Sequence, residues 1–253
     1  MDNTKRFDTN DYVFNANSKN GIYIIHGFTS TTYEVKDLAK YLSNYDYYVK
    51  AKNLPGHGTS IDDCNNTKYT EWLSHVEKDV ADMASDCDEI HVVGISMGGV
   101  LALHLASLFP LSSVTAAATV FKFKNEFNAR VLTPLLNWLI PTIDKSSLYK
   151  DGGKLKFHGY SSYPMKALNQ MRKLTNVVRP NLKKINCPIL LIHTKLDLTC
   201  IIDNLEIIKN EISSTKIKEL ILEESTHNLF VKGPEQDIIF KNIQNFIKEK
   251  EKI

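Results

Sequence analysis

The stretch Gly94-Ile95-Ser96-Met97-Gly98 decides the fold of this chain. Residues 89–93 before it are mostly apolar, with two adjacent valines, and predict a buried strand. Residues 97–109 after it contain no proline and predict a helix. The pattern G-x-S-x-G therefore falls at a strand-to-helix turn, where a serine is strained and its hydroxyl stands above the sheet. We interpret Ser96 as a candidate nucleophile; the alternative is a tight turn with an incidental serine.

Apolar runs alternate with helical patterns along most of the chain. Alternation of this kind predicts an α/β fold with a mostly parallel, doubly wound sheet that helices cover on both faces. The predicted strands are residues 12–14, 21–25, 45–51, 89–93, 113–121, 188–193 and 217–222. The predicted helices are residues 31–42, 67–85, 97–109, 165–182 and 201–212, and one that begins at Pro234.

Residues 122–164 interrupt this alternation. The apolar run 131–143 is broken by Pro134, Asn137 and Pro141, and it is too short to span a bilayer. We predict a core of residues 1–121 and 165–253, into which a small helical cap of residues 122–164 is inserted. Because the cap follows a predicted strand, we expect it to lie over the site.

Composition narrows the class of protein. The 253 residues, 43% of them hydrophobic and 24% charged, suit one globular α/β domain. A net charge of +2 gives no support for nucleic acid as a partner. The N-terminal residues are polar and do not resemble a signal peptide, so we expect a cytoplasmic protein without a membrane span. The four cysteines form no CxxC pair, so we predict no metal and no cofactor. Cys64, Cys87, Cys187 and Cys200 are expected to be reduced thiols, and Cys200, near Asp197 but without a base, is expected to be inert.

Three further strand ends carry chemically useful residues. Ligands and reactive groups of open α/β sheets collect beyond the carboxyl ends of the strands. A serine hydroxyl needs a base, and the base needs an acceptor that fixes its tautomer. His227 and Asp197 follow predicted strands and can serve as base and acid, in the order Ser–Asp–His expected for this type of elbow. The backbone N–H groups of Phe28 and Met97 are the predicted oxyanion hole.

Other carboxylates compete with Asp197 for the role of the acid. Asp203 stands where the next predicted helix begins, and a role at the helix N-terminus explains it. Glu223 and Glu224 follow the last strand, but that loop already delivers His227. Asp144 belongs to the predicted cap. Asp197 follows the buried strand 188–193 by a few residues, which places it at the same edge of the sheet as Ser96, and we therefore predict it as the acid.

The motifs that carry this constellation resemble those of the α/β-hydrolase superfamily, and within it small bacterial carboxylesterases and monoacylglycerol lipases. They are His26-Gly27-Phe28-Thr29, Pro55-Gly56-His57-Gly58, Trp72 with Asp79-Val80, Gly94-Ile95-Ser96-Met97-Gly98-Gly99, Asp197 and Thr226-His227. The resemblance implies a cap over an apolar acyl pocket and chemistry without a cofactor. One departure is the stretch 198–201 after the acid, which lacks the proline that related sequences often have.

The function that we predict is that of a serine carboxylester hydrolase. Its substrates would be short- to medium-chain acyl esters, with monoacylglycerols among the candidates, and an acyl-enzyme would form on Ser96. The same triad also suits a thioesterase, a peptidase or a perhydrolase, and a module that binds a small ligand without catalysis is the alternative from another class. The sequence specifies neither the physiological ester nor an oligomeric state. The residues predicted to contact the acyl group are Phe127, Leu132, Leu135, Leu136, Trp138 and Leu139.

Overall fold

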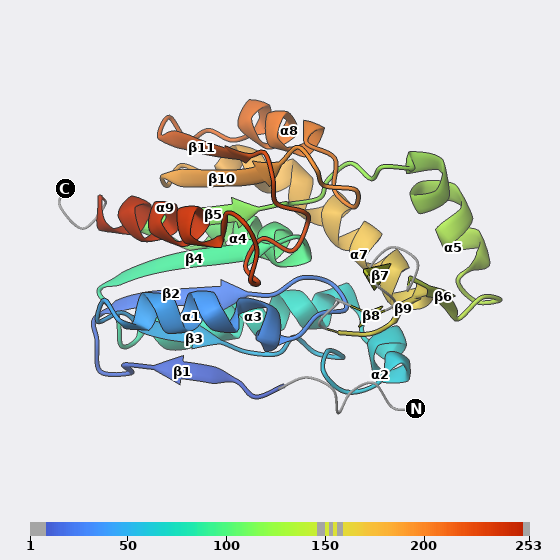
Figure 1. Ribbon diagram of the computed structural model, residues 1–253, viewed down its shortest axis with the longest axis horizontal. Coiled ribbons are helices and arrows are strands. Elements are labelled where there is room, and N and C mark those ends of the chain that lie inside the picture. The colour runs from blue at the N-terminus through green and yellow to red at the C-terminus, as the bar shows by residue number, and fades with distance from the viewer. Residues whose placement is uncertain (1–8, 146–149, 152–153, 156–158, 250–253) are drawn as a thin grey trace.

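A twisted sheet of seven strands forms the centre of the molecule (Figure 1). The computed structural model describes residues 9–145, 150–151, 154–155 and 159–249. The strand order is β1-β3-β2-β4-β5-β10-β11; β1 runs antiparallel to β3, and all other neighbours are parallel. The prediction of a mostly parallel sheet is confirmed. The strands are β1 (Tyr12–Phe14), β2 (Asn20–Ile25), β3 (Tyr48–Ala51), β4 (Glu89–Ile95), β5 (Ser113–Ala117), β10 (Ile189–Thr194) and β11 (Ile217–Leu222).

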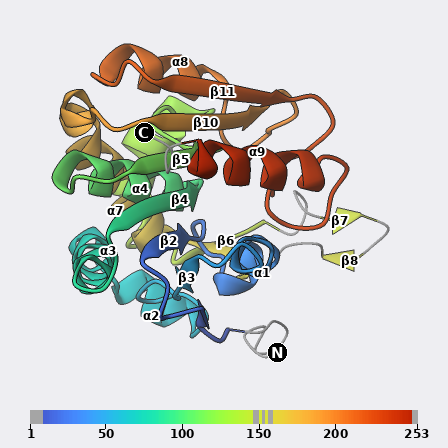
Figure 2. The same cartoon turned by 90° about the vertical axis from the view of Figure 1, so that its left-hand side faces the viewer.

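Helices cover both faces of the sheet, as Figure 2 shows from the side. On one face, α1 (Lys36–Ser43) and α9 (Gln236–Lys248) bury their apolar residues against the strands. The other face carries α3 (Tyr69–Ala84), α4 (Met97–Leu108), α7 (Met165–Val178) and α8 (Asp203–Glu211). Each face therefore has its own apolar core, and the sheet separates the two.

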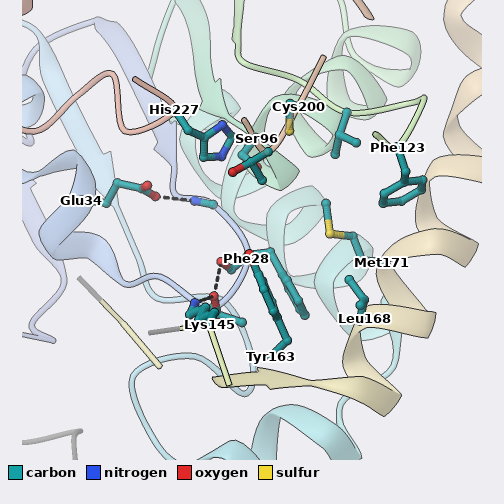
Figure 3. Close-up of a pocket in the computed structure, with 14 residues that line it drawn as sticks. Phe28, Glu34, Ser96, Phe123, Lys145, Tyr163, Leu168, Met171, Cys200 and His227 are labelled. Carbon is teal, nitrogen blue, oxygen red and sulfur yellow. Dashed lines mark hydrogen bonds between the residues drawn. The ribbon is translucent and has the colours of Figure 1, made fainter. Parts of the chain in front are cut away.

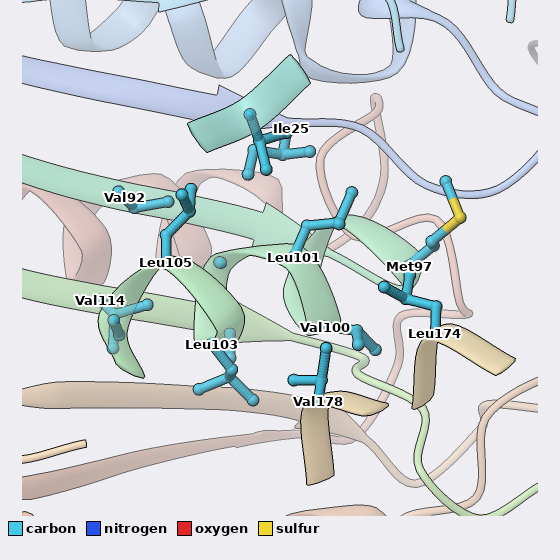
Figure 4. Packing of buried hydrophobic residues seen from close by; sticks show 14 of the residues in the cluster. Ile25, Val92, Met97, Val100, Leu101, Leu103, Leu105, Val114, Leu174 and Val178 are labelled. Atoms are coloured by element: carbon cyan, nitrogen blue, oxygen red, sulfur yellow. The ribbon is translucent and has the colours of Figure 1, made fainter. Parts of the chain in front are cut away.

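The helix after the elbow, α4, is buried along most of its length. Ten of its twelve residues, from Met97 to Ala106, are buried. In Figure 4 its leucines pack between the strand residues Val92 and Val114 and the α7 residues Leu174 and Val178. A helix that is apolar all round can be stable only inside a core. This packing fixes the start of α4, and with it the position of Ser96.

Some boundaries differ from those predicted. The helix expected at 31–42 splits into a 3₁₀ turn, η2 (Thr32–Val35), and α1, because the Thr31 hydroxyl caps the turn at the N–H of Tyr33. A short helix, α2 (Ile61–Asn66), was not predicted; Ser60 caps it. Strand β5 ends at Ala117 instead of residue 121, because Ala118 has a φ of 43° and turns the chain out of the sheet.

The segment 122–164, which we call the cap segment, lies beyond the carboxyl ends of the strands (Figure 1). Its π-helix η3 (Asn128–Leu132) and α5 (Thr133–Leu136) pack against α7. The cap segment was predicted to be helical, but it also contains short strands, because Pro141 ends the helical run and Thr142–Asp144 pair with a later strand. These strands are β6 (Thr142–Asp144), β7 (Lys150–Asp151), β8 (Lys154–Leu155) and β9 (Ser162–Pro164).

A 3₁₀ helix, η4 (Arg179–Lys184), continues α7 toward β10. Among the residues that the structure describes, none of the helices combines the length and apolar character that crossing a membrane requires.

Candidate active site

Ser96 occupies a strained turn between β4 and α4. Its φ of 56° and ψ of −117° are unusual for a residue with a side chain, and its backbone N–H donates to the Ala117 carbonyl at 2.8 Å. A Cβ on Gly94 would stand 2.0 Å from the Gly98 carbonyl oxygen, and a Cβ on Gly98 would stand 2.2 Å from the Ile25 carbonyl oxygen. Only glycine fits at these two positions. Ser96 itself is 6% exposed and lines a cavity that is partly open to solvent.

His227 and Asp197 meet beside this turn. The His227 Nδ1 and the Asp197 Oδ2 are 2.7 Å apart. The other carboxylate oxygen of Asp197 accepts the backbone N–H groups of Thr199 at 2.7 Å and of Cys200 at 2.8 Å. These bonds hold the carboxylate in place, so the imidazole presents its Nε2 away from Asp197. Ser96 and His227 line the same cavity, and Figure 3 draws them close together.

The charges of this pair stabilise each other. Burial works against ionisation of Asp197, but His227 and the two backbone N–H groups hold the pKa of that carboxyl below its usual value. Burial also lowers the pKa of an imidazole, but Asp197 outweighs it and raises the pKa of His227 above its usual value. Glu34 acts on His227 in the same direction as Asp197, and Lys145 acts in the opposite one.

The competing carboxylates lie elsewhere. Asp203 forms an exposed ion pair with Lys122 at 3.0 Å, and Glu223 forms one with Lys195 at 2.7 Å. The backbone N–H of Glu224, like that of Glu223, bonds to the Glu235 side chain. Asp144 is exposed in β6. In the structure Asp197 therefore holds the position beside His227 that the sequence predicts for it.

The loop that carries His227 has its own anchor, which sequence reasoning missed. The Glu235 carboxylate accepts the backbone N–H groups of Glu223, Glu224 and Ser225 at 3.1, 3.1 and 2.8 Å. The Thr194 hydroxyl, at the end of β10, donates to the Ser225 carbonyl. Glu235 and Thr194 therefore fix the chain at Ser225, two residues before His227.

The predicted oxyanion loop, Gly27-Phe28-Thr29, is held at its first residue by a buried acid. The Gly27 N–H donates to the Glu34 carboxylate at 2.7 Å. Burial raises the pKa of Glu34, while the bond from Gly27 favours its charged form. His26 braces the preceding turn: its Nε2 accepts the Leu54 N–H at 3.1 Å, and burial lowers its pKa to about 3. His26 is therefore neutral and structural.

The cavity over Ser96 has a volume of about 170 Å³. In Figure 3 the apolar side chains of Phe123, Leu168 and Met171 gather on one side, away from Glu34 and Lys145. The oxyanion-loop residue Phe28 lines it as well. The complete lining is Gly27, Phe28, Thr29, Glu34, Ser96, Val120, Phe123, Lys145, Tyr163, Leu168, Met171, Thr199, Cys200 and His227.

The six predicted acyl contacts do not line this cavity. Phe127, Leu135, Trp138 and Leu139 are exposed, Trp138 to 70%, while Leu132 and Leu136 are half-buried. The physical reason is that η3 and α5 pack against α7, and α7 itself provides the wall. Leu168 and Met171 could have been found from their i, i+3 spacing on the predicted helix 165–182, which places both on one face.

Cys200 is closer to the reacting groups than the sequence suggests. Cys200 lines the same cavity as Ser96, and burial raises the pKa of its thiol well above the usual value. Asp197, Cys200 and His227 offer atoms within 4.8 Å of one another, the spacing of a metal site. However, a neutral thiol and a carboxylate already engaged by three donors are poor ligands, so this donor set fits a triad better than an ion.

The family of this chain follows from comparison with known proteins. A family model described as serine aminopeptidase, S33, matches residues 16–233. A thermostable monoacylglycerol lipase of Bacillus sp. (strain H-257) is 27% identical over 90% of each chain. A carboxylesterase of Bacillus subtilis (strain 168) is 24% identical, over 94% of this chain and 96% of that protein.

Solved structures share the same architecture. A structure from a study of the metagenome-derived lipolytic enzymes LipS and LipT superposes with a TM-score of 0.86 and is 23% identical in sequence. The match covers 95% of this chain and 98% of that one, so the fold is shared from end to end. This chain belongs to the serine aminopeptidase S33 family of α/β-hydrolases.

Proposed function

We propose that this chain is a serine carboxylester hydrolase that works through an acyl-enzyme. One observation carries the proposal: Ser96 stands in a strained elbow and lines one cavity with His227, whose Nδ1 lies 2.7 Å from the buried Asp197 carboxylate. A non-catalytic binding module needs neither the strain nor the charge pair. The ester and lipid substrates named for the relatives support the same choice.

The reaction follows from the roles of these groups. Neutral His227 takes the Ser96 proton as the hydroxyl oxygen attacks the acyl carbon, and Asp197 stabilises the imidazolium that forms. The backbone N–H groups of Phe28 and Met97 bind the tetrahedral oxyanion. His227 then gives its proton to the leaving alcohol. Water, activated by the same imidazole, releases the acid.

The substrate class follows from the two sides of the cavity. The acyl chain lies along Val120, Phe123, Leu168 and Met171. Each methylene buried against these apolar side chains stabilises binding by about 0.8 kcal/mol. The cap segment reaches the acyl site through Phe123, Lys145 and Tyr163 of β9, whereas no residue of η3 or α5 lines it. A cavity of about 170 Å³ suits a short to medium acyl chain. Monoacylglycerols of that length are the candidate natural esters, by analogy with the lipase relative.

A peptidase is the second candidate, because the family description names serine aminopeptidases. A buried carboxylate in the cavity, such as Glu34, is the group that an α-ammonium would need. Lys145 lines the same cavity and would repel that ammonium if it is charged. The apolar wall favours the ester.

Labelling and a substrate profile test the proposal. A fluorophosphonate should add once to the native protein, at Ser96, and Ser96→Ala should abolish both the adduct and the hydrolysis of p-nitrophenyl esters. Matched acyl-CoA and aminoacyl-anilide substrates separate the thioesterase and the peptidase from the esterase. If native protein gives no adduct and no hydrolysis, the binding module replaces the enzyme.

A further inference from the structure

Lys145 is a buried amine that sequence reasoning did not single out. It follows β6 in the cap segment and is 1% exposed, yet it lines the cavity over Ser96. Its backbone N–H donates to the Ser161 carbonyl at 3.1 Å, so the main chain is fixed to the strand pair β6–β9. Its Nζ lies 4.9 Å from the centre of the Tyr163 ring. The cap segment therefore delivers this amine at a defined place.

The amine reaches the predicted oxyanion loop. Lys145 Nζ donates to the Thr29 hydroxyl at 2.5 Å, and that hydroxyl donates to the Phe28 carbonyl at 2.6 Å; Figure 3 draws these bonds beside Lys145. The chain of two hydrogen bonds ends on the residue whose N–H we propose as an oxyanion donor. A charged or a neutral amine can donate the first bond, so the contact does not depend on the charge of Lys145.

Thr29 needs outside support for its conformation. Its φ of 61° is in the left-handed region, which a β-branched residue rarely adopts. Three bonds oppose relaxation: the two through its hydroxyl, and one from the Tyr160 N–H to the Thr29 carbonyl at 2.9 Å. Lys145 and Tyr160 both belong to the cap segment. The loop is therefore held on its first residue by Glu34 of the core and on its last by the cap segment.

We propose that Lys145 is a positioning residue for the oxyanion hole, through which the docked cap segment holds Thr29 and thereby the Phe28 N–H in the catalytic geometry. The inference rests on the proposed function, because it takes Phe28 as an oxyanion donor. Oxyanion donors are effective only when they lie about 2.7–3.1 Å from the position that the oxyanion occupies, so a shift of a few tenths of an ångström weakens them. When the bond from Lys145 is lost, Thr29 and the Phe28 carbonyl relax together, and Phe28 turns so that its N–H no longer points at the oxyanion. The cavity remains, but the oxyanion is bound less well.

Lys145→Met tests the inference, because methionine fills similar space without donating a hydrogen bond. We expect kcat for p-nitrophenyl acetate to fall about 10- to 100-fold while KM stays within about twofold, since the loss is confined to the transition state. The hole serves both acylation and deacylation, so kcat falls whichever step limits. The inhibition constant of a methyl trifluoromethyl ketone, which forms an oxyanion on the serine, should rise by a similar factor.

Thr29→Val supplies a second variant that keeps the β-branched shape and removes only the hydroxyl. It should reproduce the loss in kcat, and the double variant should lose no more than the larger single loss, because both act through one chain of bonds. Lys166→Met is the matched control: this lysine is exposed at the start of α7, and its loss should leave kcat within about twofold.

Several outcomes overturn the inference. A folded Lys145→Met protein that keeps the wild-type kcat, or that loses activity only through KM, shows that the amine does not position the hole. If Lys145→Met fails to fold, a Thr29→Val protein with full kcat leads to the same conclusion. If the wild type hydrolyses no ester and gives no Ser96 adduct, the proposed function falls first and the inference falls with it; an active, labelled wild type confines any failure to Lys145.

Discussion

The rim of the sheet, where the strand ends place Ser96, Asp197 and His227, meets the cap segment at one cavity. The two regions hold their side chains differently. At the rim, Asp197 is fixed by two backbone N–H groups and His227, and Ser96 by a turn that only glycines can surround. In the cap segment, Trp138 and Leu135 are more than half exposed and contact the cavity nowhere. The residues that we propose as the triad are held by the backbone of the core. The cap segment contributes through the residues it docks, such as Lys145 and Tyr163.

The largest expected effect lies at the rim. Asp197→Asn should lower kcat by about 10⁴-fold, the loss known for the same change in a serine protease, because an amide favours the wrong imidazole tautomer. The fold should stay intact, which circular dichroism can check. Asp203→Asn and Glu223→Gln are the controls, since both residues form exposed ion pairs. If either control loses most of kcat while Asp197→Asn keeps more than a tenth, the acid is misassigned.

The pH dependence of the rim is the next effect in size. His227 must be neutral to act as a base, and Asp197 and Glu34 raise its pKa, against burial and Lys145. We therefore expect kcat/KM to rise about tenfold per pH unit below a midpoint above the usual histidine value, and then to level off. A profile that is flat from about pH 5 to about pH 9 would contradict the role of His227.

The contribution of His227 to stability should fall over the pH range in which the activity rises. Because the folded pKa of His227 is raised, its contribution to stability is complete below the unfolded pKa and is lost as pH rises through the folded one. The lowered pKa of Asp197 gives a contribution that is present above its unfolded pKa and is lost as pH falls through the folded one. Thermal melts across the pH range of the rate profile measure these contributions. They should show the contribution of His227 to stability declining over the pH range in which the activity rises.

A smaller effect is expected at the anchor of the His227 loop. Glu235→Ala removes the acceptor of three backbone N–H groups, so the loop should loosen and kcat should fall about tenfold, with little change in KM. Glu235→Gln keeps one good acceptor and should recover part of the loss. Asp237→Ala, an exposed neighbour in α9, is the control. Equal activity of the Ala variant and the control would show that the anchor does not position His227.

The same contrast explains what sequence could predict. Ser96, Asp197 and His227 follow from local patterns, because parallel strands must bring their carboxyl ends to one edge. The Lys145 contact did not follow, since 116 residues separate it from Thr29 and no periodicity marks it. The helical fraction of the cap segment was overestimated for a similar reason: the pairing of β6 with β9 is a tertiary choice that overrides local propensity.

The assignment of the acyl wall gives the smallest expected effect and the sharpest test of the contrast. Leu168 lines the cavity from α7, whereas Trp138 points outward in the cap segment and is 70% exposed. A wall that buries the acyl chain adds about 0.8 kcal/mol, or about fourfold in kcat/KM, for each methylene. Leu168→Ala removes part of that wall, so this gain should shrink for the longer chains, while the rate on the acetyl ester changes little.

Trp138→Ala is the matched variant from the other region. It should leave both the slope of log kcat/KM against acyl length and the acetyl rate as in the wild type, because the side chain does not line the cavity. A series of p-nitrophenyl esters from acetyl to decanoyl measures both slopes. If Trp138→Ala flattens the slope and Leu168→Ala does not, the cap segment closes over bound substrate and brings its outer face to the acyl chain. The contrast between a fixed rim and an outward-facing cap segment would then hold only for the free enzyme.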